Sequence, residues 1–449
     1  MKRRIALKKL GLLAVGASLP ESPCLGKSSA GVRQIETDVL IVGGGTAGVV
    51  AAIQTARAGC RTILVENGSR LGGTMTAGGV SFPGLFHAWG KQIIAGIGWE
   101  LVSETVAMNG DALPDFTVPF GKNHPKHQIH ISIPLYTLLA EEKCLQAGVN
   151  IRYYETPVKI QRSSNSWAID VAGKGTHCRI VCNQLIDCTG NASVTSIAGY
   201  RVLREAETQP GSLIFELGGY DLKTLDAAIL EDHYKKALQD GRLQKTDVLH
   251  SILGTLRAKG GGVPQHVLNA DSTTSVSHTL ANIDGRASLL RIIRFVKTLP
   301  GCEKASVVKM QPETAVRETY RIDGLYRITH DDYVSGRLFD DALSWSYYPI
   351  DLHVEEGVKP RHLAEGKVAT IPLRALIPQK SKNLIVAGRC VSSDRLANSA
   401  LRVQASCMGM GQAAGAAAAL AFMNNTTPAS VNVNDIKKLI RRHQGIVPE

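Results

Sequence analysis

One stretch near the start of the chain limits the fold more than any other: "TDVLIVGGGTAGVVAAIQTARAG", residues 37–59. Residues 39–42 form an apolar run of the kind that is buried as a strand in a parallel sheet. Gly43, Gly45 and Gly48 follow in G-x-G-x-x-G register at the start of a helix pattern. In such a turn the first glycine permits the tight bend, the second lets the backbone approach a pyrophosphate, and the third lets helix and strand pack closely. The pattern predicts an α/β unit that binds a dinucleotide.

The residues that follow the turn support this interpretation. Thr46 and Ala47 begin the helix, whose N-terminus carries a partial positive charge that attracts phosphate. The next strand, "RTILVE", ends in Glu66, 18 residues after Gly48. A carboxylate there accepts hydrogen bonds from both hydroxyls of an adenosine ribose, so Glu66 disfavours a 2′-phosphate. A tight turn with an unrelated surface acid is the alternative, and the agreement of strand, helix and acid argues against it.

A second glycine-rich segment indicates which dinucleotide is bound. "NGSRLGGTMTAGGV" follows Glu66, and its Gly73 and Thr74 place more backbone donors beside a pyrophosphate, an extension that resembles flavoproteins. Over residues 35–424 the chain resembles the FAD-dependent oxidoreductase family related to the fumarate reductase flavoprotein and glutathione reductase groups. The stretches that carry the resemblance are, in order, "GGTMTAGGV", "TQPGSLIFELGG", "RETYRIDGLYRIT", "FDDALSWSYYPIDLH", "IPLRALIP", "NLIVAGRC" and "RVQASCMGMGQAAGAAAALA".

The resemblance implies FAD as the cofactor and assigns contacts to residues further along the chain. Val158 would touch the adenine. Thr189 and Gly190, in "DCTGN", would pass beside the adenosine half of the cofactor. Gly388 and Arg389 would lie by the ribityl chain and the pyrophosphate.

The same resemblance places Arg402 and Val403 at the start of the last long helix, beneath the isoalloxazine. Positive charge there stabilises reduced flavin, which is negative near N1 and O2. Two residues depart from the family pattern: Asn191 replaces the usual acid after the "TG" pair, and Arg395 stands where many relatives carry His. The histidine that carries flavin covalently in the related succinate dehydrogenases would lie near residues 67–80, which contain none, so we expect non-covalent FAD.

The expected reaction is hydride transfer between flavin N5 and a small organic substrate, while a base takes the proton from the substrate hydroxyl or amine. His353, in "YYPIDLH", is the first candidate for that base or acid, and Asp351 would share its strand face and orient it. Tyr348 and Arg317 are candidates for holding an anionic or polyhydroxy substrate. His87, in "GLFHAWGKQ", is a second candidate for the base, with a loop histidine satisfied by backbone as the alternative.

Other reactions fit the sequence less well. No second dinucleotide fingerprint follows the first, and "WSYYPID" lacks the W-x-W-x-I-P pattern of related halogenases. His124, His127 and His130 lack a regular ligand spacing backed by Cys or Glu, so no metal is predicted. Two alternatives remain: an NAD-dependent dehydrogenase, identified by the cofactor released on denaturation, and a flavin-free binding protein with a decayed socket, which would be colourless.

The predicted fold class is α/β, with a Rossmann-like FAD-binding domain whose parallel sheet is flanked by helices and a small β-meander. An inserted substrate or cap domain interrupts it, because amphipathic helix patterns fill the interval between the FAD-binding blocks. The expected boundaries are 1–30 for a signal peptide, 35–215 and 305–425 for the discontinuous FAD-binding domain, 216–304 for the cap domain, and 426–449 for a C-terminal tail helix.

The first 30 residues have a basic start, a short apolar run and small residues near two candidate cleavage points, which is typical of a signal peptide. About ten apolar residues are too few to cross a bilayer, which needs about 20. Arg3 and Arg4 partly match the twin-arginine export signal, and an ordinary secretory signal is the alternative. We therefore expect an exported protein, periplasmic or extracytoplasmic.

Composition excludes several classes of protein. Hydrophobic residues make up 44% of the 449 residues and charged residues 20%, as in a globular chain. Nine cysteines without a C-x-x-C pair argue against a dithiol reductase. The net charge is +12, but outside the N-terminal segment the sequence has no Lys/Arg run with interleaved aromatics, so nucleic acid is not an expected partner. Residues 405–423 are uncharged and about long enough to span a membrane, but their Ala and Gly favour a tightly packed core helix. A small-molecule substrate and an unspecified electron donor or acceptor are the partners expected.

Overall fold

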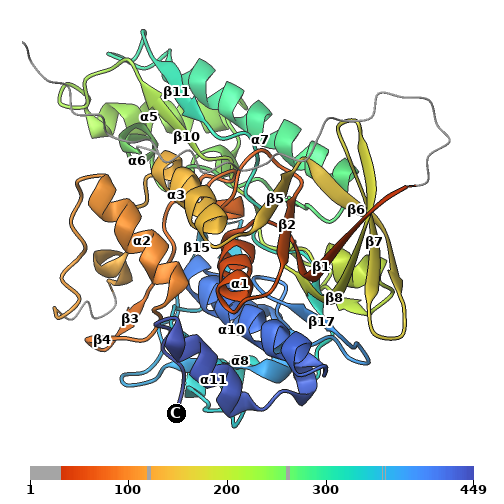
Figure 1. Cartoon of the computed structure of the whole chain (residues 1–449). Coiled ribbons are helices and arrows are strands. Elements are labelled where there is room, and N and C mark those ends of the chain that lie inside the picture. The colour runs from red at the N-terminus through yellow and green to blue at the C-terminus, as the bar shows by residue number, and fades with distance from the viewer. Residues whose placement is uncertain (1–31, 119–122, 259–262, 356, 359) are drawn as a thin grey trace, which may run out of the picture.

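A seven-stranded sheet forms the centre of the chain (Figure 1). The computed structural model describes residues 32–118, 123–258, 263–355, 357–358 and 360–449, and the predicted signal peptide lies outside these ranges. The strands follow the order β5-β2-β1-β8-β7-β6, and β17 also pairs with β8. Their bounds are β1 Arg33–Val42, β2 Thr62–Glu66, β5 Asn150–Tyr153, β6 Glu155–Arg162, β7 Trp167–Gly173, β8 Thr176–Asp187 and β17 Leu384–Val386.

Strand β8 joins a parallel sheet to an antiparallel meander. One edge of β8 pairs with β1 in parallel, and its other edge pairs first with β7 and then, over its last residues, with β17. Strands β5, β2, β1, β8 and β17 are therefore parallel, while β6, β7 and β8 form the predicted β-meander. The apolar run of residues 39–42 is fully buried in β1, as expected for a strand covered on both faces.

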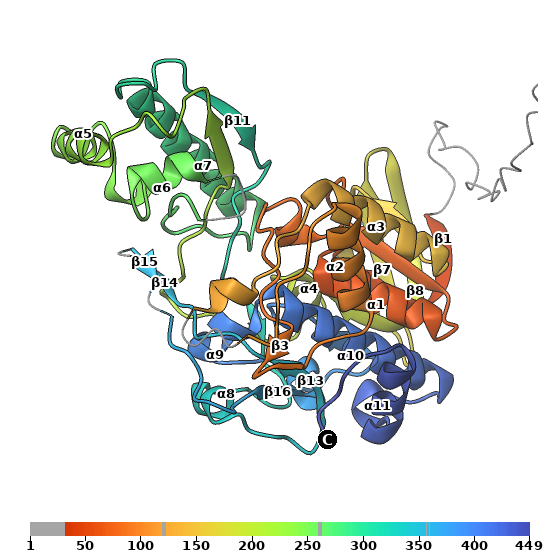
Figure 2. The same ribbon diagram turned by 90° about the vertical axis from the view of Figure 1, so that its left-hand side faces the viewer.

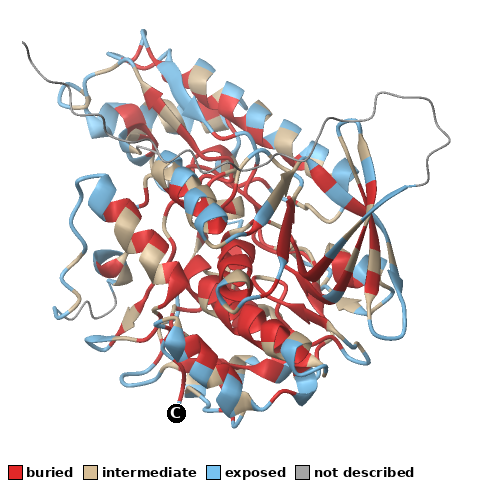
Figure 3. Cartoon of the chain, viewed as in Figure 1, coloured by how far each residue is buried: buried red, intermediate tan, exposed pale blue. Residues whose placement is uncertain are grey.

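Two helices of small residues, α1 (Thr46–Arg57) and α10 (Gln404–Met423), pack closely beside this sheet (Figure 3). A Cβ on Gly411 would lie 2.3 Å from the carbonyl oxygen of Ala47, and one on Gly415 would lie 2.7 Å from that of Ala51. Glycine is therefore required at both positions for the two backbones to approach. Among the described helices, α10 alone is long and apolar enough to cross a membrane, but 78% of that stretch is buried inside the protein.

The remaining secondary structure surrounds this core. The helices are α2 Ile97–Met108, α3 Ile133–Gln146, α4 Ser193–Ile197, α8 His330–Ser335, α9 Arg395–Leu401 and α11 Val433–Arg442. The short strands pair as β3 (His87–Ala88) with β4 (Lys91–Gln92), β9 (Val202–Leu203) with β12 (Arg321–Ile322), β13 (Ala342–Ser346) with β16 (Ala369–Pro372), and β14 (His353–Val354) with β15 (Gly357–Val358).

A lobe projects from the rest of the chain between β10 and β11 (Figure 2). Strands β10 (Phe215–Gly218) and β11 (Ser306–Met310) pair with each other, and α5 (Ala227–Gln239), α6 (Ile252–Arg257) and α7 (Ser275–Val296) lie between them in sequence. These elements share a hydrophobic cluster distinct from the one under the sheet. We call this part the β10–β11 lobe; it overlaps the interval for which the sequence predicts a separate cap unit.

Candidate active site

A cavity of about 400 Å³ opens where the parallel strands end. Its lining includes the turn after β1, the turn after β8 and the turn after β17, together with the start of α10. In open parallel α/β sheets, ligands bind in the crevice outside the carboxyl ends of the strands. The cavity therefore occupies the place that the topology assigns to a ligand.

The three glycines after β1 have different roles in this geometry. A Cβ on Gly48 would lie 1.8 Å from the carbonyl oxygen of Gly43, and one on Gly43, where φ is +101°, would lie 2.4 Å from that of Cys188. These two glycines allow helix, strand and turn to pack. At Gly45, by contrast, an added Cβ would meet no described atom within 4 Å. Gly45 therefore borders open space in the cavity, which fits a backbone approached by phosphate.

The second glycine segment lies directly against the first. The N–H of Gly72 donates to the carbonyl oxygen of Gly44 at 2.8 Å. Gly73 adopts φ +51°, and a Cβ on it would lie 2.9 Å from the Cα of Gly45. Gly73 and Thr74 both line the cavity, as the sequence predicts for donors beside the pyrophosphate.

Glu66 directs its carboxylate at the glycine turn. The N–H of Gly44 donates to Oε2 at 2.7 Å, and the N–H of Gly68 donates to Oε1 at 2.6 Å. Burial raises the pKa of Glu66 above its ordinary value, and the two backbone hydrogen bonds oppose part of that rise. Each oxygen keeps a further lone pair for a ribose hydroxyl, so the residue fits its predicted role.

The turns after β8 and β17 meet at a buried guanidinium. Nε of Arg389 donates to the carbonyl oxygen of Gly190 and Nη1 to that of Val316, both at 2.6 Å. Gly388 has φ +103°, which favours glycine. Thr189 is held by a 2.6 Å hydrogen bond from Oγ1 to Oδ1 of Asp187. The structure thus brings the predicted residues of both turns to one wall of the cavity.

Opposite the glycine turn lies a cluster of titratable side chains. Nε2 of His353 lies 3.3 Å from Oδ2 of Asp351, and Nη2 of Arg402 lies 3.3 Å from the same oxygen. Arg402 also donates to the backbone oxygen of Asp351 at 3.1 Å. Its Nε is buried and has no hydrogen-bond partner among the described residues. His353, Asp351 and Arg402 all line the cavity, with Val403 beside them.

Burial and charge set the protonation states of this cluster. Burial lowers the pKa of His353 to about 4, and the hydrogen bond with Asp351 opposes part of that change. Burial alone would raise the pKa of Asp351, but the hydrogen bond with His353 and the charge of Arg402 bring it down to about 2. At neutral pH the imidazole is therefore neutral and the carboxylate ionised, which leaves His353 able to accept a proton.

Arg317 and Tyr348 complete the predicted substrate side. Nη1 of Arg317 donates to the carbonyl oxygen of Pro210 at 2.6 Å and to Oγ of Ser212 at 3.1 Å. Burial, followed by the charge of Arg402, lowers the pKa of Arg317 to about 9. Burial raises the pKa of Tyr348 well above its ordinary value, so both groups keep their protons at neutral pH.

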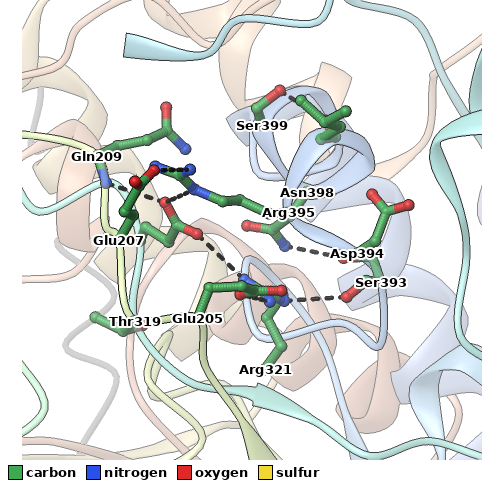
Figure 4. A network of polar contacts seen from close by, with 12 residues as sticks. Glu205, Glu207, Gln209, Thr319, Arg321, Ser393, Asp394, Arg395, Asn398 and Ser399 are labelled. Carbon is green, nitrogen blue, oxygen red and sulfur yellow. Dashed lines mark hydrogen bonds and ion pairs between the residues drawn. The ribbon is translucent and has the colours of Figure 1, made fainter. Parts of the chain in front are cut away.

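A buried polar network supports this side of the cavity (Figure 4). Oε2 of Glu318 accepts from the N–H of Gln209 at 3.0 Å and from Nε of Arg395 at 3.2 Å. Oε1 of Gln209 in turn accepts from the N–H of His353 at 3.0 Å. Arg395, which departs from the family pattern, also pairs with Glu207. Its observed contacts are therefore structural ones that hold Gln209 beside the candidate base.

Five predicted site residues are not part of the cavity lining: Gly43, Gly48 and Glu66, which pack behind the glycine turn, and His87 and Val158. His87 stacks on Phe116 with ring centroids 3.7 Å apart, and burial lowers its pKa to about 4. The β3–β4 hairpin that carries His87 thus directs the imidazole into a packed aromatic group. Val158 lies at a bulge of β6 and is 54% exposed, so the structure does not bring it to the cavity.

Other site residues are ones that sequence reasoning missed. His124 and Gln128 line the cavity, and Tyr348 accepts a hydrogen bond from Nε2 of Gln128 at 3.0 Å. His124 does not cluster with His127 as a metal site; in the described ranges no group of three or more His, Cys, Asp or Glu side chains could hold a metal ion. Further residues missed are Gln404 and Cys407, which line the cavity, and Gln209 and His266, which form hydrogen bonds with His353. Gln209, Gln404 and Cys407 lie within stretches that carry the family resemblance, which could have pointed to them, whereas no such stretch marks His124, Gln128 or His266.

The fold and the cavity define a Rossmann-like dinucleotide-binding protein. Residues 38–440 match the model of the FAD dependent oxidoreductase family, and the chain belongs to that family. It is a flavoenzyme, and FAD, bound non-covalently, is its cofactor. The family assignment favours FAD over the NAD-dependent and flavin-free alternatives.

Comparison with solved structures finds distant neighbours, while a search of curated proteins finds no match. A geranylgeranyl bacteriochlorophyll reductase-like protein from Thermoplasma acidophilum is 12% identical with a TM-score of 0.42, over 91% of this chain and 84% of the other. Anhydrotetracycline hydroxylase from Streptomyces rimosus is 11% identical with a TM-score of 0.43, over 91% and 66%. p-Nitrophenol 4-monooxygenase from Pseudomonas putida is 12% identical with a TM-score of 0.39, over 91% and 84%. Likeness at this level carries no information about the substrate.

Proposed function

We propose that this chain is an exported dehydrogenase or reductase that moves a hydride between FAD and a small anionic substrate, with His353 as the acid or base. The observation that carries the proposal is the neutral His353, held by ionised Asp351, in the same cavity as the glycine turn. Hydride transfer from a hydroxyl- or amine-bearing carbon requires a base at that hydroxyl or amine.

The cofactor-binding residues divide the cavity into two ends. Gly45 and Gly73 offer backbone at the end beside Glu66, which suits phosphate and ribose. FAD supplies a two-electron carrier that accepts or donates hydride. Arg402, at the other end, provides positive charge next to His353.

The positive charge of Arg317, which neither a carboxylate nor the expected cofactor contacts balance, indicates an anionic substrate. The described lining contains three guanidinium groups, those of Arg317, Arg389 and Arg402, but only one carboxylate, that of Asp351. Within the described residues Arg317 forms hydrogen bonds only to neutral oxygens, and no ion pair to it is found. A buried guanidinium without a carboxylate partner is costly, and a substrate carboxylate beside Arg317 would relieve that cost with paired hydrogen bonds.

The test is loss of catalysis without loss of cofactor. In His353→Gln we expect a normal flavin content, while the rate of anaerobic flavin bleaching by substrate falls by about 10²- to 10⁴-fold, the usual contribution of a positioned base. The substrate would be the compound that bleaches the wild-type flavin fastest in a screen of hydroxy acids, sugars and amines. His177→Gln, at an exposed position of β8, is the control and should bleach normally. An unchanged rate in His353→Gln would remove His353 from the reaction.

Export is proposed from the N-terminal residues, which lie outside the described ranges. The basic start with Arg3 and Arg4, followed by a short apolar run, supports a cleavable signal. When the full-length chain is expressed, we expect to find it outside the cytoplasm with its N-terminal residues removed. If the twin-arginine route is used, Arg3→Lys/Arg4→Lys should block the export. Export of the double variant would assign the ordinary secretory route, whereas retention of the wild-type chain in the cytoplasm would contradict the proposal.

A further inference from the structure

Both ring nitrogens of His353 have a partner. Nε2 faces Oδ2 of Asp351 at 3.3 Å, and Nδ1 lies 3.1 Å from Nε2 of His266. The rings of the two histidines meet edge to face with centroids 5.3 Å apart. His353 is 6% exposed and His266 only 2%. A proton that binds Nε2 of His353 therefore has a direct exit through Nδ1 to the second imidazole.

The β10–β11 lobe holds His266 firmly in this place. Gly211 and Val267 exchange two backbone hydrogen bonds at 2.8 and 2.9 Å, and Oγ of Ser212 donates to the carbonyl oxygen of Gln265 at 2.8 Å. Residues on both sides of His266 are thus tied to the segment that also contacts Arg317. The contact between the two imidazoles is a built feature of the fold, since the backbone on either side of it is fixed.

Burial keeps both imidazoles of the pair neutral. It lowers the pKa of His266 to about 3, with smaller contributions in the same direction from the charges of Arg317, His353 and His250, while a contact with the backbone of Val354 opposes part of the fall. The pKa of His353 is about 4. Both rings are therefore neutral at pH 7.

When both imidazoles are neutral, one hydrogen atom lies between Nδ1 of His353 and Nε2 of His266, and it can be bonded to either nitrogen. If His266 donates, His353 carries its own hydrogen on Nε2, toward Asp351. If His353 donates, its Nε2 is bare and can act as the base. The hydrogen bond at one nitrogen of an imidazole fixes the state of the other, so the partner at Nδ1 decides whether His353 is ready to accept a proton.

We propose that His266 is a positioning residue that sets the tautomer of His353 and receives the proton that His353 takes from the substrate. This inference rests on the proposed function. In the oxidative direction the substrate O–H or N–H bond breaks and its proton binds Nε2 of His353. The Nδ1 proton of His353 moves to Nε2 of His266, and the Nδ1 proton of His266 passes to a water molecule. Two electrons leave the substrate with its hydride to FAD, the oxidant, so the histidine pair carries one proton and no electrons.

Nδ1 of His266 is the outer end of this path. It is buried and has no hydrogen-bond partner within the part of the chain that the structure describes. A buried polar nitrogen without a partner is costly, and a proton-conducting role accounts for keeping a histidine there. The charge of the exposed His250 also acts on His266.

The first test needs no turnover. ¹⁵N spectra at neutral pH should show His353 of the wild-type protein with shifts between those of the two pure tautomers. In His266→Met, which keeps a similar volume without a hydrogen bond, His353 should move to the form protonated at Nε2, which Asp351 favours. An identical tautomer in both proteins would overturn the proposal.

The second test counts the protons that are transferred during flavin bleaching. The rate of flavin bleaching should depend on the D₂O fraction along a curve in the wild type, because more than one proton moves, and along a straight line in His266→Gln, with a rate about 10- to 100-fold lower and unchanged flavin content. His233→Gln, on α5 of the same lobe, should behave as the wild type. If His266→Gln does not fold, a straight line in the wild type still overturns the proposal.

The two proposals fail in different ways. If His353→Gln loses bleaching while His266→Gln keeps the wild-type rate and curve, the proposed function stands and the role of His266 is wrong. If neither variant slows bleaching, the assignment of His353 as base is wrong and the role of His266 falls with it.

Discussion

At the scale of single residues, the glycine turn separates what the fold needs from what the ligand needs. Gly43 and Gly48 are required by close contacts with the carbonyl oxygens of Cys188 and Gly43. Gly45 has ordinary angles, φ −64° and ψ 178°, and borders open space. A side chain there costs the apoprotein little and occupies the space beside the phosphate-binding backbone. The motif therefore predicts that a substitution of Gly45 affects FAD binding, whereas a substitution of Gly43 or Gly48 affects stability.

In Gly45→Val we expect the apoprotein to fold and melt as the wild type does, while FAD is no longer retained on purification, because the valine projects where phosphate must approach. In Gly48→Val the Cβ would meet the oxygen of Gly43, which must move, so we expect loss of stability, with insoluble protein or a lower melting temperature. Thermal melts and flavin absorbance per mole of protein measure both effects.

Normal flavin retention by Gly45→Val would show that the phosphates bind elsewhere. Unfolding of Gly45→Val would show that the space beside residue 45 is needed by the fold and not by the ligand.

At the scale of elements, the sequence predicted best where a local pattern determines the structure. The apolar run and glycines gave β1, the turn and α1. The long Ala/Gly run gave α10 as a buried helix, because only small residues permit the contact with α1. These features depend on neighbours in sequence or on residue size.

Elements that depend on distant contacts were harder to predict. The strands β14 and β15 have two residues each, too few for any periodicity. His266 and His353 are 87 residues apart and meet only because the lobe folds back toward β14. His87 was expected over the flavin from its place in the chain order, but stacking on Phe116 holds it elsewhere. Sequence alone could not supply these placements, since tertiary packing decides them.

At the scale of the whole molecule, buried neutral histidines link stability to pH. His87, His124 and His353 have pKa values lowered to about 4 and His266 to about 3, in each case chiefly by burial. In the unfolded chain the pKa of histidine is about 6.5. Below that pH the unfolded chain binds protons that the folded chain refuses, so the stability present above it is lost as the pH falls. Asp351, with a pKa of about 2, acts in the same direction at lower pH.

We therefore expect the free energy of unfolding of the apoprotein to fall between pH 6 and pH 4, by about 1.4 kcal/mol per pH unit for each buried histidine. Urea midpoints at pH 7, 6, 5 and 4 measure this. A urea midpoint that stays constant or rises on acidification would contradict the burial of neutral imidazoles. In His124→Gln the number of protons taken up on unfolding should be smaller by about one.

The contact between α1 and α10 has a consequence for how the enzyme tolerates change. Gly411 touches the backbone at Ala47, a lining residue of the phosphate end, while α10 begins beside Arg402 at the opposite end. The packing of α1 on α10 therefore holds the two ends of the cavity at a constant distance. A change in that distance would weaken the binding of both the nucleotide and the flavin. Substitutions that change substrate specificity are therefore tolerated in the lobe and in the loops around Arg317, but not in the paired helices.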